Sequence, residues 1–235
     1  MSGNPSPIRC VRCVLPETFP GVDLDEDGLC RYCREYGGGA SAPGEKSRLA
    51  SRFETLLSQR RGRGSYDVLM AYSGGKDSTY TLVELRRRYD LRVLALSVDN
   101  GFISEQTFPN VRRIVESLGV DHLWFHPDFE LLKSVFAACA ERSPFPAKAL
   151  ERASAICTAC IGLVKALALR TAVEKGIPFI GYGWSPGQAP LTSAIMPNNP
   201  AFVRGTQNSL LKALLTVGDD RLRAYFLEPR PFETA

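Results

Sequence analysis

Short, continuous apolar runs alternate with amphipathic segments through most of the chain. Apolar and β-branched runs predict strands at 66–72, 92–99, 122–126 and 178–182. Apolar residues at helical spacing predict helices at 45–60, 78–89 and 105–118, helical material within 128–176, and closing helices at 208–217 and 221–227. Apolar strands that alternate with helices form parallel sheets with both faces covered, so the pattern predicts an α/β fold.

The carboxyl ends of the strands are where a fold of this class binds ligands. Three marked stretches follow predicted strands at this edge: residues 73–78, residues 97–101 and residues 181–188. In the second stretch, Asn100-Gly101 is also a strong turn signal by itself. The two histidines, His122 and His126, fall on one face of a strand, and the sequence assigns them no role.

The first stretch, Ser73-Gly74-Gly75-Lys76-Asp77-Ser78, combines paired glycines, a lysine and the start of a predicted helix. Glycines allow successive backbone N–H groups to converge, and a helix N-terminus adds free donors and a partial positive charge. The loop is therefore a predicted cradle for a phosphate-like anion. A Walker-type loop does not fit, because it needs four residues between its first glycine and the Gly-Lys pair.

This hexapeptide after a strand resembles the pyrophosphate loop of the PP-loop (N-type) ATP pyrophosphatase superfamily. The resemblance implies an adenine-nucleotide alpha hydrolase-like fold, ATP and Mg²⁺ as cofactors, and adenylation of a substrate oxygen with release of pyrophosphate. Lys76 would neutralise phosphate, Asp77 would orient the loop or position Mg²⁺, and Ser73 and Ser78 would donate hydrogen bonds. The implied ATP-binding residues are Ala71, Ser73, Gly74, Gly75, Lys76, Asp77, Ser78, Ser97, Val98, Asp99 and Gly181.

Four cysteines near the N-terminus form two Cys-x2-Cys knuckles, Cys10 with Cys13 and Cys30 with Cys33. Their spacing is typical of a structural zinc site, in which four thiolates leave no open position for catalysis. The surrounding residues are poor in core formers and need such a cross-link to hold one shape. We therefore predict a zinc-ribbon-like unit at 1–36, a flexible linker at 37–46, and a PP-loop domain at 47–235.

A second set of cysteines, Cys139, Cys157 and Cys160, lies in the middle of the chain. Cys157 and Cys160 open a predicted helix, and a helix N-terminus lowers a thiol pKa. Three interpretations compete for the set. The cysteines are buried and inert, which suits Cys139; or the pair is a redox or persulfide-carrying pair; or all three hold an iron–sulfur cluster.

The central pair also resembles the tRNA 2-thiolation branch of the superfamily, in which a cysteine pair and one distant cysteine hold a 4Fe–4S cluster. The chain departs from that branch, because no cysteine follows Cys160 and only Cys139 is left as a third ligand. Its basic residue, Lys165, follows Cys160 by five positions instead of four. The branch's aspartate-bearing loop is replaced by residues 183–188.

The front of the chain, residues 10–21 and 25–33, resembles instead the N-acetyl sugar amidotransferases, and residues 98–102 are compatible with either branch. The two resemblances imply different nucleophiles, sulfur or ammonia. We favour a sulfurtransferase with Cys157 and Cys160 as catalytic residues beside Lys76 and Asp77, because ammonia transfer would not explain the cysteine pair. The alternatives are an amidotransferase that works with a glutaminase subunit, and a non-catalytic zinc protein that senses ATP.

Composition bears on the cellular location of the protein but does not identify its substrate. The chain has 235 residues, 44% hydrophobic and 23% charged, with a formal net charge of +4, which tolerates a nucleic-acid partner without requiring one. There is no apolar run of membrane-spanning length and no signal-peptide core, so we expect a cytoplasmic protein with reduced cysteines and no membrane partner. We expect a homodimer, a sulfur donor, and a small-molecule, nucleotide or tRNA acceptor.

Overall fold

The computed structural model describes residues 7–19, 21–35, 44–150, 153–184, 194–196 and 199–227. The chain divides into two compact units, residues 1–52 and residues 53–235. Most of the predicted linker, residues 37–43, lies outside the described residues, and its last two residues, Glu45 and Lys46, begin the helix α2 (Glu45–Arg60).

The N-terminal unit has little regular structure. It contains the short helix α1 (Arg31–Glu35) and two isolated antiparallel bridges, Arg9 with Pro16 and Leu24 with Cys30. Its buried core consists of Cys10, Val22 and Cys30. So small an apolar core cannot hold a fold without a cross-link, which is the role expected of a metal.

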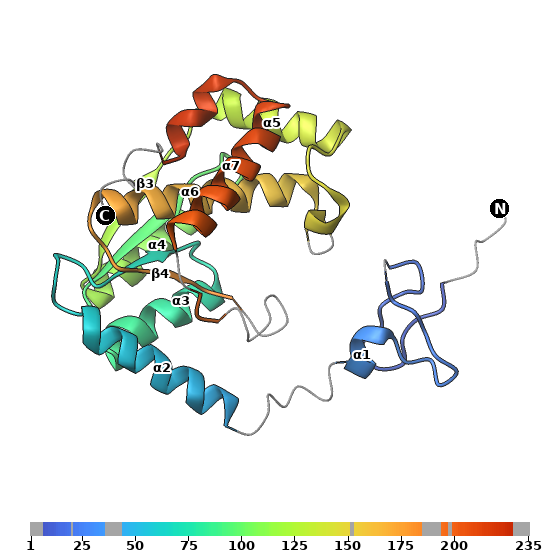
Figure 1. Ribbon diagram of the computed structural model, residues 1–235, viewed down its shortest axis with the longest axis horizontal. Coiled ribbons are helices and arrows are strands. Elements are labelled where there is room, and N and C mark those ends of the chain that lie inside the picture. Colours follow the sequence, from blue (N-terminus) through green and yellow to red (C-terminus); the bar gives the residue numbers. More distant parts are fainter. Residues whose placement is uncertain are drawn as a thin grey trace. The chain divides into compact units, whose positions relative to one another are not determined.

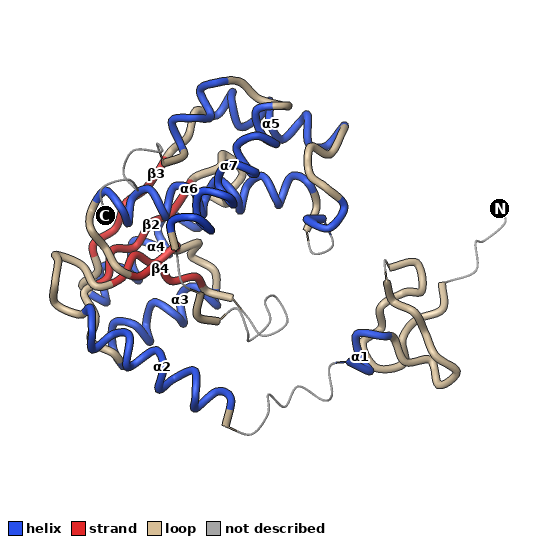
Figure 2. The backbone as a smooth tube through the Cα atoms, in the orientation of Figure 1, coloured by secondary structure: helices blue, strands red, loops and turns tan. Residues whose placement is uncertain are grey.

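The larger unit is built on a four-stranded parallel sheet, seen in Figures 1 and 2. Its strands are β1 (Val68–Ala71), β2 (Val93–Val98), β3 (Asp121–Phe125) and β4 (Phe179–Tyr182), in the order β3-β2-β1-β4. Every neighbouring pair is parallel. The predicted α/β class with a parallel sheet is confirmed, and the four predicted strands are the four observed.

Helices follow each strand in the sequence, largely as predicted. They are α3 (Lys76–Val83), the π-helical turn η1 (Glu84–Arg88), α4 (Thr107–Leu118), α5 (Phe129–Glu141), the short η2 (Ala147–Leu150), α6 (Ala155–Glu174), α7 (Pro200–Leu215) and the 3-10 helix η4 (Asp220–Tyr225). Several helix boundaries differ from the prediction by one or two residues; α4, for example, begins at Thr107 and not at 105. The helix α3 begins at Lys76, not Ser78, and α7 begins well before residue 208, with Pro200 at a first-turn position that proline favours.

Each face of the sheet carries its own core, because side chains alternate along a strand. On β1, Val68 and Met70 join the core under α3 and α4, whereas Leu69 joins the core under α5, α6 and α7. The helix α6 has the length and hydropathy of a membrane span, alone among the described helices. Its residues Leu163, Ala166 and Leu167 are buried in the second core.

Asp67, just before β1, is a buried carboxylate that ties two strand starts together. It is 2% exposed and accepts backbone N–H groups from Gly62 at 2.8 Å and Arg92 at 2.9 Å. The Arg92 guanidinium donates to both of its oxygens, at 3.1 and 2.9 Å. This ion pair holds the pKa of Asp67 well below its usual range.

Replacing Asp67 by asparagine is expected to lower the free energy of unfolding at pH 7 by about 2–3 kcal/mol. This value is at the low end for breaking a buried ion pair, because the Arg92 side chain is half exposed. Because the pKa of Asp67 is lower in the folded than in the unfolded chain, its ionised form stabilises the folded protein. This stabilisation is complete above the unfolded-state pKa of about 4 and is lost as the pH falls through the folded-state pKa. Urea unfolding at pH 7 and pH 3 should therefore show a difference that narrows in acid. Asp90→Asn, which removes the exposed ion pairs of Asp90 with Arg61 and Arg86, is the matched control. An Asp67 variant no less stable than this control would contradict the assignment.

Candidate functional site

The loop after β1 is held in a tight turn by two serines. Gly74 has φ +76°, and a Cβ there would lie 2.7 Å from a methyl group of Val111 on α4. The Ser73 and Ser78 hydroxyls lie 3.0 Å apart; Ser73 Oγ accepts the Gly75 N–H at 3.3 Å, and Ser78 Oγ donates to the Gly75 carbonyl at 3.0 Å. The serines therefore fix the shape of the loop, and the predicted donor Ser78 is itself buried.

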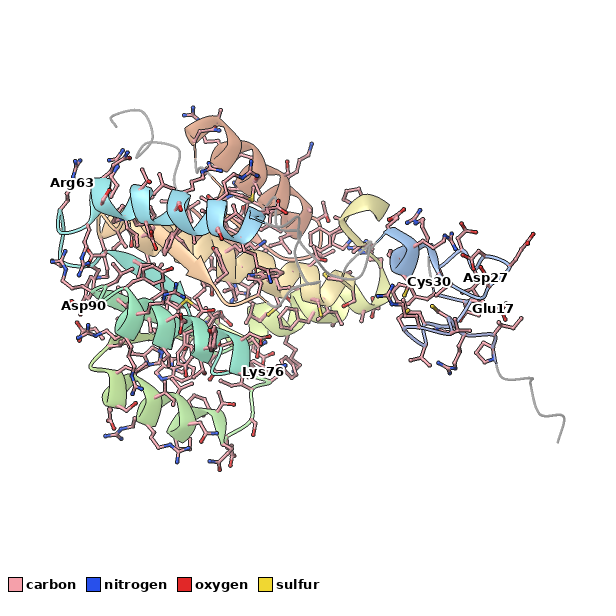
Figure 3. All side chains as sticks on the ribbon, turned by 90° about the horizontal axis from the view of Figure 1, so that it is seen from below. Glu17, Asp27, Cys30, Arg63, Lys76 and Asp90 are labelled. Atoms are coloured by element: carbon pink, nitrogen blue, oxygen red, sulfur yellow. The ribbon has the colours of Figure 1, made fainter. Side chains whose placement is uncertain are left out.

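Lys76 and Asp77 stand in the first turn of α3, because the helix begins two residues earlier than predicted. Gly75 is the N-cap and offers no side chain to the first N–H groups of the helix, which have no intrahelical partner. Lys76 is exposed at this end of α3, where Figure 3 labels it. Free donors, the helix dipole and a lysine ammonium together make an anion site.

Ser97, one of the residues expected to frame the nucleotide, lies at the end of β2, and its side chain makes contacts inside the protein. Its side chain is buried, and its hydroxyl donates to the Tyr72 carbonyl at 2.6 Å. His122 Nε2 lies 2.8 Å from the same hydroxyl, and since the Ser97 proton is already given to Tyr72, Nε2 carries a proton and donates. Burial lowers the pKa of His122, which favours this neutral form. The bridge joins three strands, and nothing in the sequence pointed to it.

The residues after β2 connect the sheet edge to the central cysteines. Asp99 accepts the Gly101 N–H at 2.8 Å and lies 3.3 Å from His126 Nδ1. Asn100 accepts the Phe102 N–H at 3.0 Å, and its Nδ2 donates to Cys160 Sγ at 3.5 Å. This contact joins residues sixty positions apart in the sequence and brings Cys160 to the carboxyl edge of the sheet, where the loop of residues 73–78 also begins.

The third stretch, after β4, lies against the loop of residues 73–78. A Cβ at Gly183 would be 2.3 Å from Ser78 Cα, so the two backbones are in direct contact. The predicted ATP-binding residue Gly181 lies within β4, as its place in the predicted strand implied, and a Cβ there would meet Met70 Sδ at 3.0 Å. Burial raises the pKa of the neighbouring Tyr182 to about 12. The rest of this stretch, residues 185–188, lies outside the described residues.

The helix α6 presents its cysteines at its N-terminus, capped by Ser154, whose hydroxyl accepts the Cys157 N–H at 3.2 Å. Cys157 is exposed and Cys160 is partly buried. Cys139 is 5% exposed in the core, and burial raises its pKa. Within the described residues these three cysteines form no group that could hold a single metal ion.

Lys165, further along α6, adds a cation near the same edge. Its ammonium lies 5.2 Å from the centre of the Trp184 ring, and Trp184 directly follows Gly183. Burial lowers the pKa of Lys165, and within the described part of the chain it has no ion pair. Lys165 is itself an exposed residue, so its ammonium is an accessible positive charge near this edge.

The four N-terminal cysteines are brought together as predicted. Their sulfur atoms all lie within 4.8 Å of one another, with Cys10 and Cys33 3.8 Å apart and Cys13 and Cys30 3.5 Å apart. A tetrahedral ion with metal–sulfur bonds of about 2.3 Å separates its ligands by about 3.8 Å. Burial and the other thiols raise the pKa of Cys33 to about 12, so the set ionises fully only with a cation. These residues form a four-cysteine metal site.

We expect this site to hold zinc, and replacing Cys10 and Cys30 by serine should remove it. The purified wild-type protein should contain about one zinc per chain by elemental mass spectrometry, whereas the double variant should contain none. Because the core of this unit is so small, the variant should also become sensitive to protease within residues 7–35. Replacing the buried Cys139 by alanine is the control; zinc that persists in the double variant would reject the site.

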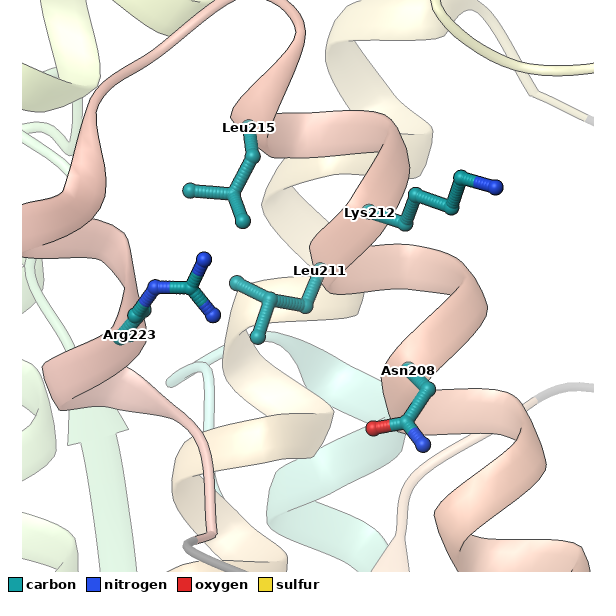
Figure 4. Close-up of a pocket in the computed structure, with 5 residues that line it drawn as sticks. All are labelled: Asn208, Leu211, Lys212, Leu215 and Arg223. Carbon is teal, nitrogen blue, oxygen red and sulfur yellow. The ribbon is translucent and has the colours of Figure 1, made fainter.

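A surface groove between α7 and η4 stands apart from these features (Figure 4). Its lining residues are Asn208, Leu211, Lys212, Leu215 and Arg223. The Arg223 charge is already paired with Asp220 at 2.9 Å. None of the predicted site residues lines it.

Comparisons with known proteins give distant likenesses. No family model matches the chain. An uncharacterized protein of Methanocaldococcus jannaschii is 26% identical over 99 residues, which span 42% of this chain and 35% of that protein.

Solved structures that the chain resembles distantly include the following three. A U34-tRNA thiolase from Methanococcus maripaludis with its 4Fe–4S cluster is 18% identical, with 75% of this chain and 54% of that chain covered and a TM-score of 0.37. An NH3-dependent NAD synthetase from Campylobacter jejuni is 13% identical (83% and 91% covered, TM-score 0.40), and an NMN synthetase from Francisella tularensis is 15% identical (78% and 74% covered, TM-score 0.42). At these scores the assignment rests on the chain itself. Its Ser-Gly-Gly-Lys-Asp-Ser loop, placed between β1 and α3 at the carboxyl edge of a parallel sheet, fits the PP-loop ATP pyrophosphatase superfamily.

Proposed function

We propose that the protein splits ATP into AMP and pyrophosphate, adenylates a carbonyl oxygen of an acceptor, and then replaces that oxygen with sulfur carried on Cys157. The observation that carries this proposal is the contact between Asn100 and Cys160. It places the cysteine pair at the strand edge that also bears the anion site. A cysteine pair kept at that position has a use in sulfur transfer and none in ammonia transfer.

The first step uses the loop and the start of α3. The acceptor oxygen attacks the α-phosphorus, the bond from that phosphorus to the bridging oxygen breaks, and pyrophosphate leaves with the electron pair. Lys76 and the N–H groups of the α3 terminus stabilise the charge on pyrophosphate, which is the main contribution a protein makes to such a step. Asp77, in the same turn, is suited to hold Mg²⁺, which would supply further charge neutralisation.

The second step uses the two thiols. A persulfide on Cys157 attacks the adenylated carbon with its outer sulfur, and AMP leaves with the oxygen. Cys160 then attacks the Cys157 sulfur, which releases the thiocarbonyl product and forms a disulfide that an external thiol reductant must reduce. Cys157 suits the carrier role because it is exposed at a helix N-terminus, and Cys160 suits the resolving role because it is one turn away and partly buried.

The sulfur carrier can be tested directly. After incubation with a sulfane-sulfur donor such as polysulfide, the wild-type protein should carry cyanide-labile sulfur, and alkylation with mass spectrometry should locate it on Cys157. A Cys157→Ser variant should lose more than about 90% of this sulfur, because the thiolate is the group that accepts it. A Cys139→Ala variant should keep it, since that thiol is buried. Labile sulfur retained in the Cys157 variant would contradict the proposal.

The main rival is an amidotransferase, whose support is the resemblance of the N-terminal unit. A double variant with serine in place of Cys157 and Cys160 separates the two functions. If this variant still forms product from ammonium at the wild-type rate, the protein is an amidotransferase and not a sulfurtransferase. A non-catalytic ATP sensor predicts no pyrophosphate release with any acceptor.

The zinc unit is a poor surface for tRNA. Residues 7–35 contain four arginines, no lysine and six carboxylates, a net charge of −2 before any metal is bound. Arg34, moreover, is paired with Asp23 and Asp25. Nucleic-acid binding depends on unpaired positive charge, so a nucleic-acid acceptor would have to be held by the larger unit. The acceptor, a cytoplasmic location and a homodimer remain predictions.

A further inference from the structure

The strand β3 forms one edge of the sheet, with β2 on one side and no described strand on the other. The Phe125 carbonyl accepts the Asp99 N–H at 2.9 Å, so the backbone groups of Phe125 face β2. Successive residues of a strand turn their backbone groups to opposite sides, so the N–H and C=O groups of His122 and Trp124 face the open edge. Within the described residues, nothing is hydrogen-bonded to these four groups.

The open edge of β3 has little protection against pairing with another strand. Proteins usually protect such an edge with a lysine, a proline, a bulge or an inward-pointing charge. Residues 121–125 include no lysine and no proline, and their register with β2 has no bulge. Their one carboxylate, Asp121, stands at the start of the strand and accepts the Tyr66 hydroxyl at 2.7 Å. The middle of the strand instead carries Leu123, which is 38% exposed.

A pocket of about 470 Å³ lies between this edge strand and α4. Its lining includes Phe108 of α4 and the rings of His122 and Trp124. The Trp124 ring centre lies 4.8 Å from that of Phe108 and 5.1 Å from that of His122. The two residues whose backbone groups face the open edge therefore also present aromatic rings beside it. A strand added to β3 would gain hydrogen bonds from the edge and apolar contacts from these rings.

The strand is complementary to a second copy of itself. In an antiparallel pair, opposite residues whose backbone groups face each other exchange two hydrogen bonds. A twofold axis at Leu123 places His122 of one protomer opposite Trp124 of its partner, and the reverse, so that all the free groups are used. Each His122 ring then meets a Trp124 ring on one face of the sheet, and the two Leu123 side chains meet on the other.

We propose that β3 pairs antiparallel with β3 of a second copy of this chain, so that two four-stranded sheets join into one continuous sheet in a homodimer. A second copy is favoured over an unrelated peptide because it supplies a matching residue at each position of the strand. The carboxyl edges of the two halves then face opposite ways, so each protomer keeps a complete site. The dimer uses none of the residues proposed to act on ATP or sulfur.

Sedimentation velocity on the full-length protein should show a dimer for the wild type at tens of micromolar, a range in which weak association is detected. Leu123→Lys should weaken the dimer by about tenfold to a hundredfold, because two apolar contacts are lost and two ammonium groups come to lie opposite each other. Ile161→Lys, which adds the same charge at an equally exposed position on α6, is the control and should remain a dimer. Pyrophosphate release per chain should be unchanged in Leu123→Lys.

A cross-link tests the register even if the lysine variant fails to fold. The two Cα atoms at position 123 would lie about 4.5 Å apart, within reach of a disulfide. Leu123→Cys should therefore give a covalent dimer under mild oxidation, and mass spectrometry should locate the bond between the two copies of position 123. Asp121→Cys is the control, because that position would lie more than about 13 Å from its own copy and should not cross-link.

Three results would overturn the proposal. These are a wild-type protein that sediments as a monomer, a folded Leu123→Lys variant that dimerises as well as the wild type, or a covalent dimer of Leu123→Cys that is linked only through other cysteines. Thermal unfolding of each variant shows whether the fold is kept. None of these measurements requires turnover of ATP, so the dimer and the proposed function can fail separately.

Discussion

Replacing Lys76 by alanine is expected to reduce pyrophosphate release from ATP by about a hundredfold to a thousandfold, as is usual when one preorganised group loses its contact with developing charge. Lys76 is exposed in the first turn of α3, where the helix dipole and free N–H groups already favour an anion. Its ammonium supplies the full positive charge at that point. Stability should change little, because the side chain packs against no core.

The matched control is Lys133→Ala, which removes an exposed lysine whose described partner is Glu130 on the same helix. Both variants should melt at the wild-type temperature, and pyrophosphate should be measured by a coupled assay with a mixture of candidate acceptors. Pyrophosphate release that is equally lost in both variants, or equally kept, would remove Lys76 from the site.

Replacing Gly183 by alanine is expected to reduce the same activity by about a hundredfold, the cost of misplacing a site by about 1 Å. The new Cβ would lie 2.3 Å from Ser78 Cα and 2.5 Å from Ser78 N. Real Cβ atoms do not approach backbone so closely, and backbone cannot rotate away as a long side chain can. The alanine must therefore push β4 and the first turn of α3 apart, which moves Lys76 relative to the loop.

Gly205→Ala is the control for this change. It introduces the same methyl group into α7, where nothing lies within 4 Å and where alanine is the better helix former. This variant should keep full activity and gain slightly in thermal stability. If Gly183→Ala behaves in the same way, the stretch after β4 does not press on the pyrophosphate loop.

The sequence predicted those features that depend on local pattern. Continuous apolar runs identify buried parallel strands, and the spacing of Cys10, Cys13, Cys30 and Cys33 identifies a metal site before any coordinates are known. The loop at 73–78 is recognised because it needs particular residues in consecutive positions. Even here the start of α3 was misjudged by two residues, since a glycine N-cap leaves no side-chain signal.

The contacts that assemble the site could not be read from the sequence. Asn100 meets Cys160 and Gly183 meets Ser78 only because the strands pair in the order β3-β2-β1-β4 and α6 returns across the sheet. The Ser97 hydroxyl bridges Tyr72 and His122, a contact that no local pattern in the sequence predicts. Each of these contacts joins segments that are remote in sequence, and packing alone decides which side chains meet.

The products formed from ATP are the most direct test of the central claim. ATP labelled at the α-phosphate should be incubated with the wild-type protein, Mg²⁺ and candidate acceptors, and the labelled product identified by chromatography. Cleavage between the α and β phosphates predicts labelled AMP with an equal amount of pyrophosphate, both absent with Lys76→Ala. Labelled ADP with free phosphate, or the same yield of AMP from the Lys76 variant, would contradict it.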